Sequence, residues 1–392
     1  MKTQELDKKY VLPTYGRVDV EFVSAKNATL KDTTGKEYID FTSGIGVVSV
    51  GHANDRVTKA LCEQISNITH ISNLYYITPQ AKAAQKVVEA SGYDMACFFA
   101  NSGAEANEGA IKIARKHGER DGEIKRYKII TLNHSFHGRT ITTVKATGQE
   151  SMHNYFGPFP DGFVYADGID EIEALLDDHT AAVMIELIQG EGGVEPQDKA
   201  KVQALAKLLK EKEIPLIVDE VQTGAYRTGE FTASQLYGIE PEIITLAKGV
   251  GGGVPVGIVM TSLKEVLSAG DHGSTFGGNY LSARAVCEVV DILSELKESG
   301  DLEITSLMFN QALEKFYNAH KDIFTQKVGI GMMCGLRVKD AQTLSDIIAN
   351  AKDAGVMVLK AGRNTLRFLP PLTITKKEID RGFTLLGSAL SK

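Results

Sequence analysis

Residues 214–224 of this 392-residue chain read Ile-Pro-Leu-Ile-Val-Asp-Glu-Val-Gln-Thr-Gly. The apolar run that begins at Leu216 shows no alternation of apolar and polar side chains, which is typical of a strand buried on both faces of a parallel sheet. The run closes on Asp219. The segment therefore predicts a carboxylate at the carboxyl end of a buried strand.

A later apolar run ends in the same way on a lysine, Lys248, within Leu-Ala-Lys-Gly at 246–249. Buried acids and lysines need a partner. A structural salt bridge between Asp219 and Lys248 is one interpretation. Pyridoxal 5'-phosphate is the other, because this cofactor needs a lysine for its aldehyde and an acid that keeps its pyridine nitrogen protonated. In that case Val221 packs on the cofactor ring and Gln222 lies within reach of its 3-oxygen.

Short apolar runs alternate with amphipathic stretches between Arg56 and Tyr280, which is the pattern of a parallel sheet covered by helices. Helices are predicted at 103–117 and 199–212, where apolar residues recur at three- and four-residue spacing. We expect an α/β fold with both faces of the sheet covered. The strand candidates are 96–100, 127–132, 181–186, 216–219, 243–246 and 256–260.

The pattern changes after Tyr280. Two long helices at 281–298 and 302–320 precede the segment 328–338, a helix at 341–354 and a final strand–helix pair. Near the N-terminus, 28–32 and 35–40 predict a β-hairpin that packs with these elements. We therefore expect a large domain at 56–284 and a smaller α+β domain formed by 1–55 and 285–392 together.

Composition argues against several classes of partner. The net charge of −7 comes from 50 acids and 43 bases without long single-sign runs, so no footprint for nucleic acid or a membrane surface is visible. No apolar run approaches the roughly 20 residues that span a bilayer, and the N-terminus lacks an apolar signal core. Cys62, Cys97, Cys287 and Cys334 form no C-x-x-C pair, which indicates neither a zinc site nor a disulfide framework. Small-molecule partners and a cytoplasmic location are expected.

A tight turn follows the first strand candidate, at Asn-Ser-Gly-Ala-Glu-Ala from 101 to 106. The exposed amides at the start of the next helix, together with the Ser102 hydroxyl, suit a phosphate dianion. The alternative is an ordinary helix cap at Ser102, with Glu105 completing a capping box.

Polar residues also follow two other strand candidates. Phe136 can stack on a flat ring beside His137, and Arg139 can hold a substrate carboxylate in bidentate fashion. A phenylalanine at this place can equally belong to the core. Glu186 ends the run at 181–186 and is placed to pair with a mobile arginine, although a loop amide would satisfy it equally well.

Two segments in the C-terminal half carry further candidates. Ser274 and Thr275 supply hydroxyls that can close a phosphate site, including one in a partner subunit. Arg367 lies on a strand candidate from which it can reach a substrate α-carboxylate, and the alternative is a solvated strand arginine.

Taken together, these segments resemble the class III aminotransferases, which are pyridoxal phosphate enzymes of fold-type I. The resemblance covers nearly the whole chain and implies a large domain with a mainly parallel seven-stranded sheet. The segments that carry it are 40–45 with 51–52, 101–107, 136–140, 190–193, 219–224, Lys248, 274–279 and 367–371.

The resemblance assigns roles around a cofactor. Asp219 would pair with the pyridinium nitrogen, Lys248 would bind the aldehyde carbon, and Thr275 would contact the phosphate in the neighbouring subunit. A site completed by a neighbour implies a homodimer. The expected cofactor contacts are Ser102, Gly103, Ala104, Phe136, His137, Asp219, Glu220, Val221, Gln222, Lys248 and Thr275.

The resemblance also implies two substrates and no metal. Arg367 would take the α-carboxylate of 2-oxoglutarate, the amino acceptor. Arg139 and Ser274 would lie at the carboxylate end of an acylated amino acid. Glu186 would pair with Arg367 while an ω-amine donor is bound.

Within the family, the chain looks most like the members that transfer the δ-amino group of N2-acetyl-L-ornithine in arginine biosynthesis. Ile45 stands where ornithine-specific members carry a tyrosine, which favours an acylated donor over free ornithine. Succinylornithine, N-succinyl-diaminopimelate, ornithine and 4-aminobutyrate are alternative donors. An aminomutase or a decarboxylase that uses the same cofactor is the alternative reaction.

Overall fold

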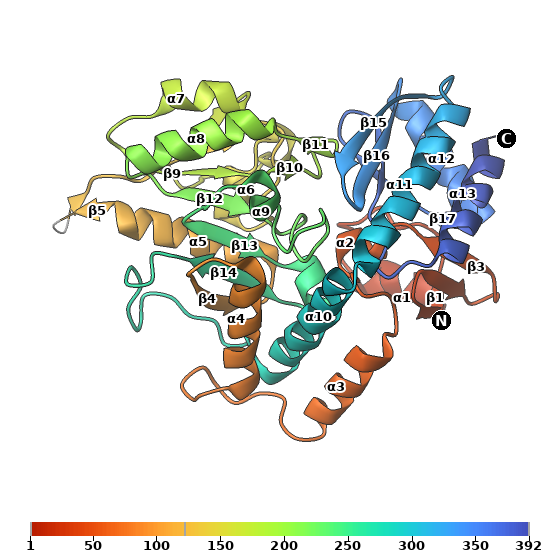
Figure 1. The fold of residues 1–392 in the computed structure, drawn as a ribbon, viewed down its shortest axis with the longest axis horizontal. Helices are drawn as coiled ribbons and strands as arrows, with labels where there is room; N and C mark the ends of the chain where they lie inside the picture. The colour runs from red at the N-terminus through yellow and green to blue at the C-terminus, as the bar shows by residue number, and fades with distance from the viewer. Residues whose placement is uncertain (1, 121–122, 391–392) are drawn as a thin grey trace.

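The computed structural model describes residues 2–120 and 123–390. Within them, a seven-stranded sheet organises the larger part of the molecule (Figure 1). Neighbouring strands are parallel except along β14, which runs antiparallel to both of its neighbours. In spatial order the strands are β4 (Ala96–Ala100), β14 (Gly257–Thr261), β13 (Ile243–Leu246), β12 (Leu216–Asp219), β9 (Thr180–Ile185), β7 (Lys128–Leu132) and β8 (Phe163–Ala166). The predicted α/β fold with a mainly parallel seven-stranded sheet is confirmed.

All six strand candidates belong to this sheet, with ends displaced by one residue or none. The sequence missed β8, the strand at one edge of the sheet. Three of its four side chains are only half-buried, so its apolar run is short and ambiguous beside the fully buried runs of β9 and β12. The sequence therefore failed to predict β8 because this strand lies at the edge of the sheet.

Helices cover both faces because successive strand residues point to opposite sides. Ile217 lies in a buried cluster with residues of α5 (Gly103–Gly118). Its neighbours Leu216 and Val218 lie in a different cluster with α8 (Lys199–Glu211). Both helices were predicted. By the same alternation, Asp219 faces the α5 side of the sheet.

The C-terminal part contains a second sheet of four antiparallel strands and three long helices, grouped with both chain termini at one end of the molecule (Figure 1). The strands are β15 (Phe324–Ile330), β16 (Met333–Val338), β19 (Thr365–Phe368) and β18 (Leu359–Ala361), and the helices are α11 (Asp301–Ala319), α12 (Ala341–Ala354) and α13 (Lys376–Leu390). The helices predicted at 302–320 and 341–354 are confirmed.

The predicted N-terminal hairpin is confirmed as β2 (Thr29–Asp32) and β3 (Glu37–Asp40). It extends into a sheet with β1 (Phe22–Lys26) and with β17 (Val356–Met357), which pairs in parallel with β3. Segments from the N-terminal and C-terminal parts of the chain therefore form one sheet. We propose two domains, a large one at 56–284 and a smaller one formed by 1–55 together with 285–392. The inner limits of this division fall at the start of α3 (Asp55–Ile65) and inside α10 (Tyr280–Glu298), and residues 1, 391 and 392 lie outside the described chain.

A cluster of aromatic rings fixes β19. Phe368 packs with Phe41, Phe309 and Phe383, with ring centroids 6.0, 6.3 and 6.1 Å away. Aromatic pairs at such distances stabilise a core beyond the area they bury. Because neighbours on a strand face opposite sides, Arg367 points away from these rings.

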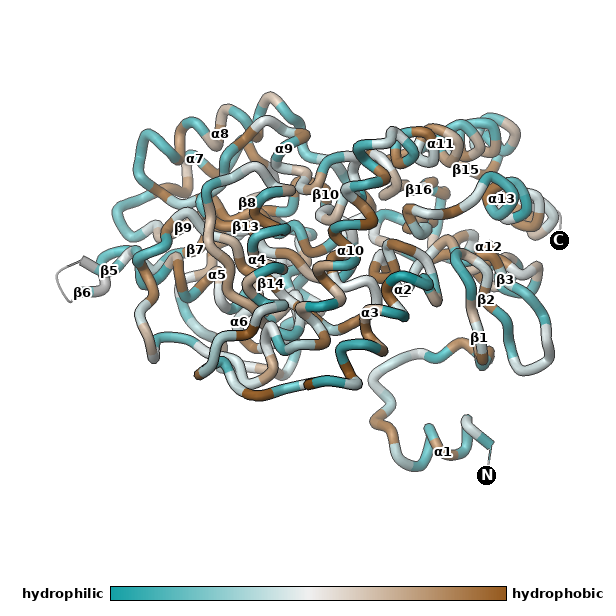
Figure 2. The backbone as a smooth tube through the Cα atoms, turned by 60° about the horizontal axis from the view of Figure 1, so that its bottom comes forward, coloured by the Kyte–Doolittle hydropathy of each residue, from teal (hydrophilic) through white to brown (hydrophobic). Residues whose placement is uncertain are grey.

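The remaining helices include α1, none of whose residues is buried and which stands apart from the rest of the chain (Figure 2). No described helix is both long and apolar enough to cross a membrane. The other elements are α1 (Thr3–Tyr10), α2 (Ser43–Gly46), α4 (Thr78–Ser91), α6 (Ile141–Ala146), α7 (Ile172–Leu175), α9 (Ala233–Tyr237), β5 (Glu119–Arg120), β6 (Glu123–Ile124), β10 (Ile188–Gln189) and β11 (Glu195–Pro196).

Candidate active site

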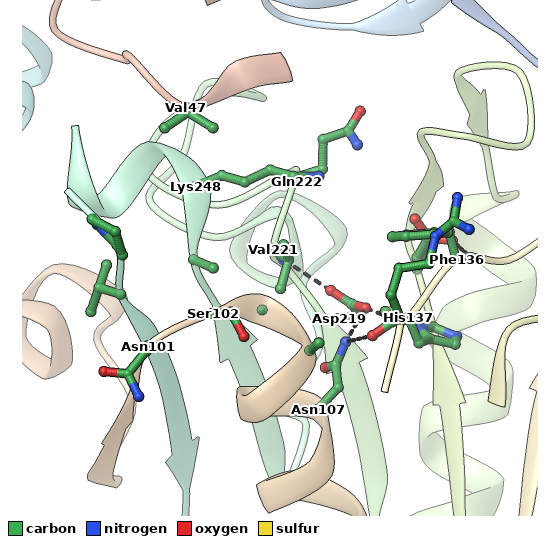
Figure 3. A pocket seen from close by; sticks show the side chains of 18 of the residues that line it. Val47, Asn101, Ser102, Asn107, Phe136, His137, Asp219, Val221, Gln222 and Lys248 are labelled. Atoms are coloured by element: carbon green, nitrogen blue, oxygen red, sulfur yellow. Dashed lines mark hydrogen bonds and ion pairs between the residues drawn. The ribbon is translucent and has the colours of Figure 1, made fainter. Parts of the chain in front are cut away.

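A recess of about 390 Å³ opens at the carboxyl ends of the parallel strands (Figure 3), where open α/β sheets bind their ligands. Its wall comes from the turns that follow β4, β7, β9, β12 and β13. Eleven of the residues expected at the site line it: Ser102, Gly103, Ala104, Phe136, His137, Arg139, Glu186, Asp219, Val221, Gln222 and Lys248.

Asp219 is held by three hydrogen bonds although only 4% of it is exposed. Asn107 Nδ2 donates to its Oδ2 at 2.8 Å, His137 Nδ1 lies 2.8 Å from the same oxygen, and the Val221 amide donates to Oδ1 at 3.0 Å (Figure 3). Buried carboxylates need such partners, and these three bonds fix the orientation of the Asp219 side chain. The recess therefore carries a fixed, oriented carboxylate at its inner end.

The sequence missed Asn107. Thr245 donates to Asn107 Oδ1 at 2.7 Å, and Asn107 Nδ2 also donates to the His137 carbonyl at 2.7 Å, so the amide has one orientation. The sequence feature that could have identified it is an asparagine among the small apolar residues on the buried face of α5. A buried amide at such a place needs polar partners, and Asp219 is one of them.

The Lys248 side chain lines the recess. Its own backbone has a φ of +44°, in the left-handed region that residues other than glycine rarely adopt. Within the described chain, its amine makes no hydrogen bond or ion pair. Loss of water around the amine lowers its pKa; the nearby Glu191 carboxylate opposes this shift and Arg367 adds to it. The free amine is thus available for covalent chemistry.

We expect the Lys248 amine of the ligand-free protein to react with trinitrobenzenesulfonate at a lower pH than ordinary lysines do. A lowered pKa means that the neutral, nucleophilic form appears earlier as the pH rises. The rate of labelling against pH, read peptide by peptide by mass spectrometry, measures this for Lys248 and for the more exposed Lys264 in one sample. A midpoint for Lys248 at or above the ordinary value of about 10.4 would contradict it.

The turn at the start of α5 serves as both a helix cap and a wall of the recess. Ser102 Oγ accepts from the Glu105 amide at 3.2 Å, and the Glu105 carboxylate accepts from the Asn101 amide at 2.6 Å. The predicted N-cap at Ser102 is therefore confirmed, whereas Glu105 accepts from the amide before the cap and does not complete the predicted capping box. Gly103 is required here because a Cβ atom would lie 2.8 Å from Val221 Cγ1. The first amides of α5, which form the positive end of the helix, remain at the recess and can bind an anion.

Phe136 and Arg139 form the opposite wall. The Arg139 guanidinium lies 5.5 Å from the centre of the Phe136 ring. The Phe136 amide donates to Glu186 at 2.9 Å, which is the loop-amide alternative for this glutamate. Burial, together with the negative charge of Asp219, raises the pKa of Glu186 well above its usual value.

Arg367 pairs with Glu191, whereas the sequence predicted Glu186 as its partner while an ω-amine donor is bound. Its Nη1 donates to Glu191 at 2.6 Å and to Gln222 Oε1 at 3.2 Å, and only 2% of the arginine is exposed. Glu186 is bound at the end of β9, whereas the following loop carries Glu191 to the C-terminal sheet, where the Gly362 amide donates to its carbonyl at 2.8 Å. Burial opposes ionisation of Glu191, but Arg367 outweighs it and lowers the pKa of this carboxyl.

Glu220, which was expected among the cofactor contacts, is fully buried and absent from the lining of the recess. Its carboxylate accepts from the amides of Ala233 and Ser234 at 2.8 and 2.7 Å, at the start of α9. The alternation that turns Asp219 toward α5 turns Glu220 to the opposite face. Its side chain supports the start of α9 and does not line the recess.

Ser274 and Thr275 line another recess, of about 370 Å³, and Arg139 is not part of it. The two recesses share Asn101, whose Nδ2 donates to Ser274 Oγ at 3.1 Å. Within one chain, Ser274 and Arg139 are therefore not brought together. Arg367 does not line the main recess itself, but its Nη1 donates to Gln222, which does.

The main recess suits a flat, anionic cofactor with a basic ring nitrogen. A helix start offers amides at one side, Phe136 and Val221 offer apolar surfaces, and the oriented Asp219 carboxylate faces inward (Figure 3). Lys248 adds a free amine. Together they can bind a phosphate, hold a proton on a ring nitrogen and attach a carbonyl carbon.

Comparison with known proteins gives consistent results. A family model described as aminotransferase class-III matches residues 11–390. The acetylornithine aminotransferase of Wolinella succinogenes is 57% identical over 388 residues, which cover 99% of each chain. Two solved structures are also similar. The N-acetylornithine aminotransferase of Stenotrophomonas maltophilia K279a has a TM-score of 0.82 at 31% identity and covers 99% of this chain and 98% of its own. An ornithine aminotransferase of Toxoplasma gondii with partial occupancy of PLP at its active site has a TM-score of 0.91 at 33% identity, over 99% and 94%.

Proposed function

Because this chain belongs to the class III aminotransferases, we propose that it transfers the δ-amino group of N2-acetyl-L-ornithine to 2-oxoglutarate. The products are N-acetyl-L-glutamate 5-semialdehyde and L-glutamate, a step of arginine biosynthesis. The observation that carries the donor is the 57% identity to the Wolinella succinogenes acetylornithine aminotransferase over nearly the full length of both chains. Ile45, two residues before the recess-lining Val47, supports an acylated donor.

We propose pyridoxal 5'-phosphate as the cofactor. Ser102, Gly103 and Ala104 would hold its phosphate, with Thr275 of a second copy completing the site in a cytoplasmic homodimer. Phe136 and Val221 would enclose the ring, and the buried Asp219 carboxylate would hold the proton on the ring nitrogen. When bound, the cofactor supplies a protonated ring that accepts electrons from the substrate carbon.

Lys248 has two tasks in this scheme. Its amine would hold the carbonyl carbon of the cofactor, and in its free form it would move a proton at the substrate carbon. A general base works best when its pKa lies near the operating pH, and the lowered pKa of Lys248 moves it in that direction. His137 and Asn107 act through Asp219, which they orient.

Glu191 lets one site accept two different substrates. The donor brings an uncharged chain toward Arg367, and an unpaired buried guanidinium there would be costly. The ion pair with Glu191 at 2.6 Å neutralises it. The acceptor brings a carboxylate, so Glu191 must release Arg367 to let it bind. Glu191 therefore takes the role that the sequence had assigned to Glu186.

Glu191→Gln should shift the balance between the two substrates. The neutral side chain leaves Arg367 partly uncompensated, so kcat/KM for N2-acetylornithine should fall about tenfold relative to kcat/KM for 2-oxoglutarate, equivalent to about 1.4 kcal/mol. Single-turnover rates of each half-reaction measure the ratio. Glu211→Gln, which removes an exposed carboxylate from α8, is the matched control. An unchanged ratio would show that Glu191 does not gate Arg367.

Dependence on the acceptor tests the reaction class. Purified holoenzyme with N2-acetylornithine should form glutamate only when 2-oxoglutarate is present, and at a higher kcat/KM than with succinylornithine, ornithine or 4-aminobutyrate. Product formation without any 2-oxo acid would instead indicate an aminomutase or a decarboxylase. A higher kcat/KM with another donor would replace the proposed substrate and retain the reaction.

A further inference from the structure

A third recess, of about 320 Å³, lies where the loop after β12 meets the C-terminal elements. Its wall includes Arg227 and Gly229 from that loop, Leu302, Ser306 and Asn310 from α11, and Met332 from the turn between β15 and β16. Lys248 and Asp219 do not line it. This recess is therefore separate from the candidate active site.

Arg227 is a buried cation that forms no ion pair with any described residue. Only 2% of it is exposed, and its Nη1 donates to two neutral carbonyl oxygens, those of Pro370 at 2.5 Å and Met332 at 3.3 Å. Its Nη2 has no hydrogen-bond partner among the described residues, and neither has the buried Thr228 hydroxyl beside it. Burial lowers the pKa of Arg227 to about 10, which leaves the guanidinium charged at neutral pH. An unpaired buried charge is costly, so an anion is the missing partner.

The acidic residue in the lining of the recess does not neutralise Arg227. Glu303 lines the recess, but its carboxylate pairs with Lys297 at 2.6 Å. The Tyr226 hydroxyl is likewise engaged, 3.0 Å from Ser294 Oγ. The rest of the wall is largely apolar, with Leu302, Leu307 and Met332. The recess thus combines one uncompensated cation with an apolar lining.

We propose that this recess binds a small molecule with a single carboxylate and an apolar body. The carboxylate contacts Arg227, and the apolar part packs against Leu302, Leu307 and Met332. Arg227 also donates a hydrogen bond to the carbonyl of Pro370, which lies three positions after Arg367 in the sequence. A ligand here touches the residue that joins the loop after Asp219 to the segment that carries Arg367.

Fluorine NMR of the holoenzyme tests the site with 4,4,4-trifluorobutyrate as the probe and 4,4,4-trifluorobutyramide as its uncharged counterpart. The parent protein is the Arg367→Gln variant, which removes an active-site arginine that also attracts carboxylates. Ser306→Phe fills the recess from α11 and leaves Arg227 in place, and Ser306→Ala is the matched control that keeps the recess open. Thermal midpoints establish that each variant is folded.

The carboxylate probe should bind the parent and the Ser306→Ala variant with affinities within about threefold, and the Ser306→Phe variant at least tenfold more weakly. The amide should bind none of them. Failure of the carboxylate to bind the parent, equal affinity for the folded Ser306→Phe variant, or equal binding of the amide would each overturn the proposal. None of these outcomes depends on which amine the enzyme uses as donor.

Discussion

Lys248→Ala should lower the rate of transamination by about 10³-fold or more. The variant loses both the amine that attaches the cofactor and the group that moves the proton, and a positioned proton-transfer group alone contributes about 10²–10⁴-fold. Lys248 is the one lysine in the lining of the main recess, so no other amine there can replace it. Glutamate formation from N2-acetylornithine and 2-oxoglutarate measures the loss.

Two controls separate chemistry from damage to the fold. Lys264→Ala removes a lysine that pairs with the exposed Asp94, and it should leave the rate within about twofold. Added ethylamine should restore part of the activity of Lys248→Ala, because a free amine can enter the space left by the side chain. A near-normal rate for Lys248→Ala would rule out the proposed mechanism.

Asp219→Asn should lower kcat by about 10²–10³-fold, the usual loss when an oriented electrostatic group is removed from an active site. Asparagine has the same size but cannot hold a proton on a ring nitrogen. The change also replaces one carboxylate oxygen by an NH₂ group, which cannot accept from Asn107 or Val221. The loss should therefore appear mainly in kcat, with the cofactor retained in the recess.

Steady-state kinetics with the cofactor content of each preparation measured by absorbance checks this prediction. Asp94→Asn, at a side chain that is 96% exposed, is the matched control. A kcat for Asp219→Asn within about fivefold of the parent would contradict the role of Asp219. Loss of cofactor in place of loss of kcat would mean that Asp219 acts in binding alone.

Local sequence patterns were sufficient for the central strands and the long helices. The runs at β9, β12 and β13 are apolar on both faces, so burial alone identified them, and Asp219 and Lys248 followed because each directly ends such a run. The half-buried edge strand β8 lacked that signal. Strand periodicity would have predicted that Glu220 faces away from the recess, because it follows Asp219 directly and neighbouring strand residues face opposite sides.

The partner of Arg367 could not be found in this way. Glu186 and Glu191 both follow β9, and the choice between them depends on the path of the loop past Gly362 in the C-terminal sheet. Gly193 adopts a φ of +123° there, and a Cβ atom on it would lie 2.9 Å from the Gly362 carbonyl. Contacts between segments so distant in sequence leave no local pattern to interpret.

The visible absorption spectrum of the purified holoenzyme provides the most direct test of the central claim. N2-acetylornithine, ornithine and 4-aminobutyrate are added to separate samples, and 2-oxoglutarate is added afterwards to each. We predict that N2-acetylornithine bleaches the band of the lysine-bound cofactor at the lowest concentration and that 2-oxoglutarate restores it. A band that no donor bleaches, or that 2-oxoglutarate fails to restore, would contradict the assignment of this chain as an aminotransferase for acylated ornithine.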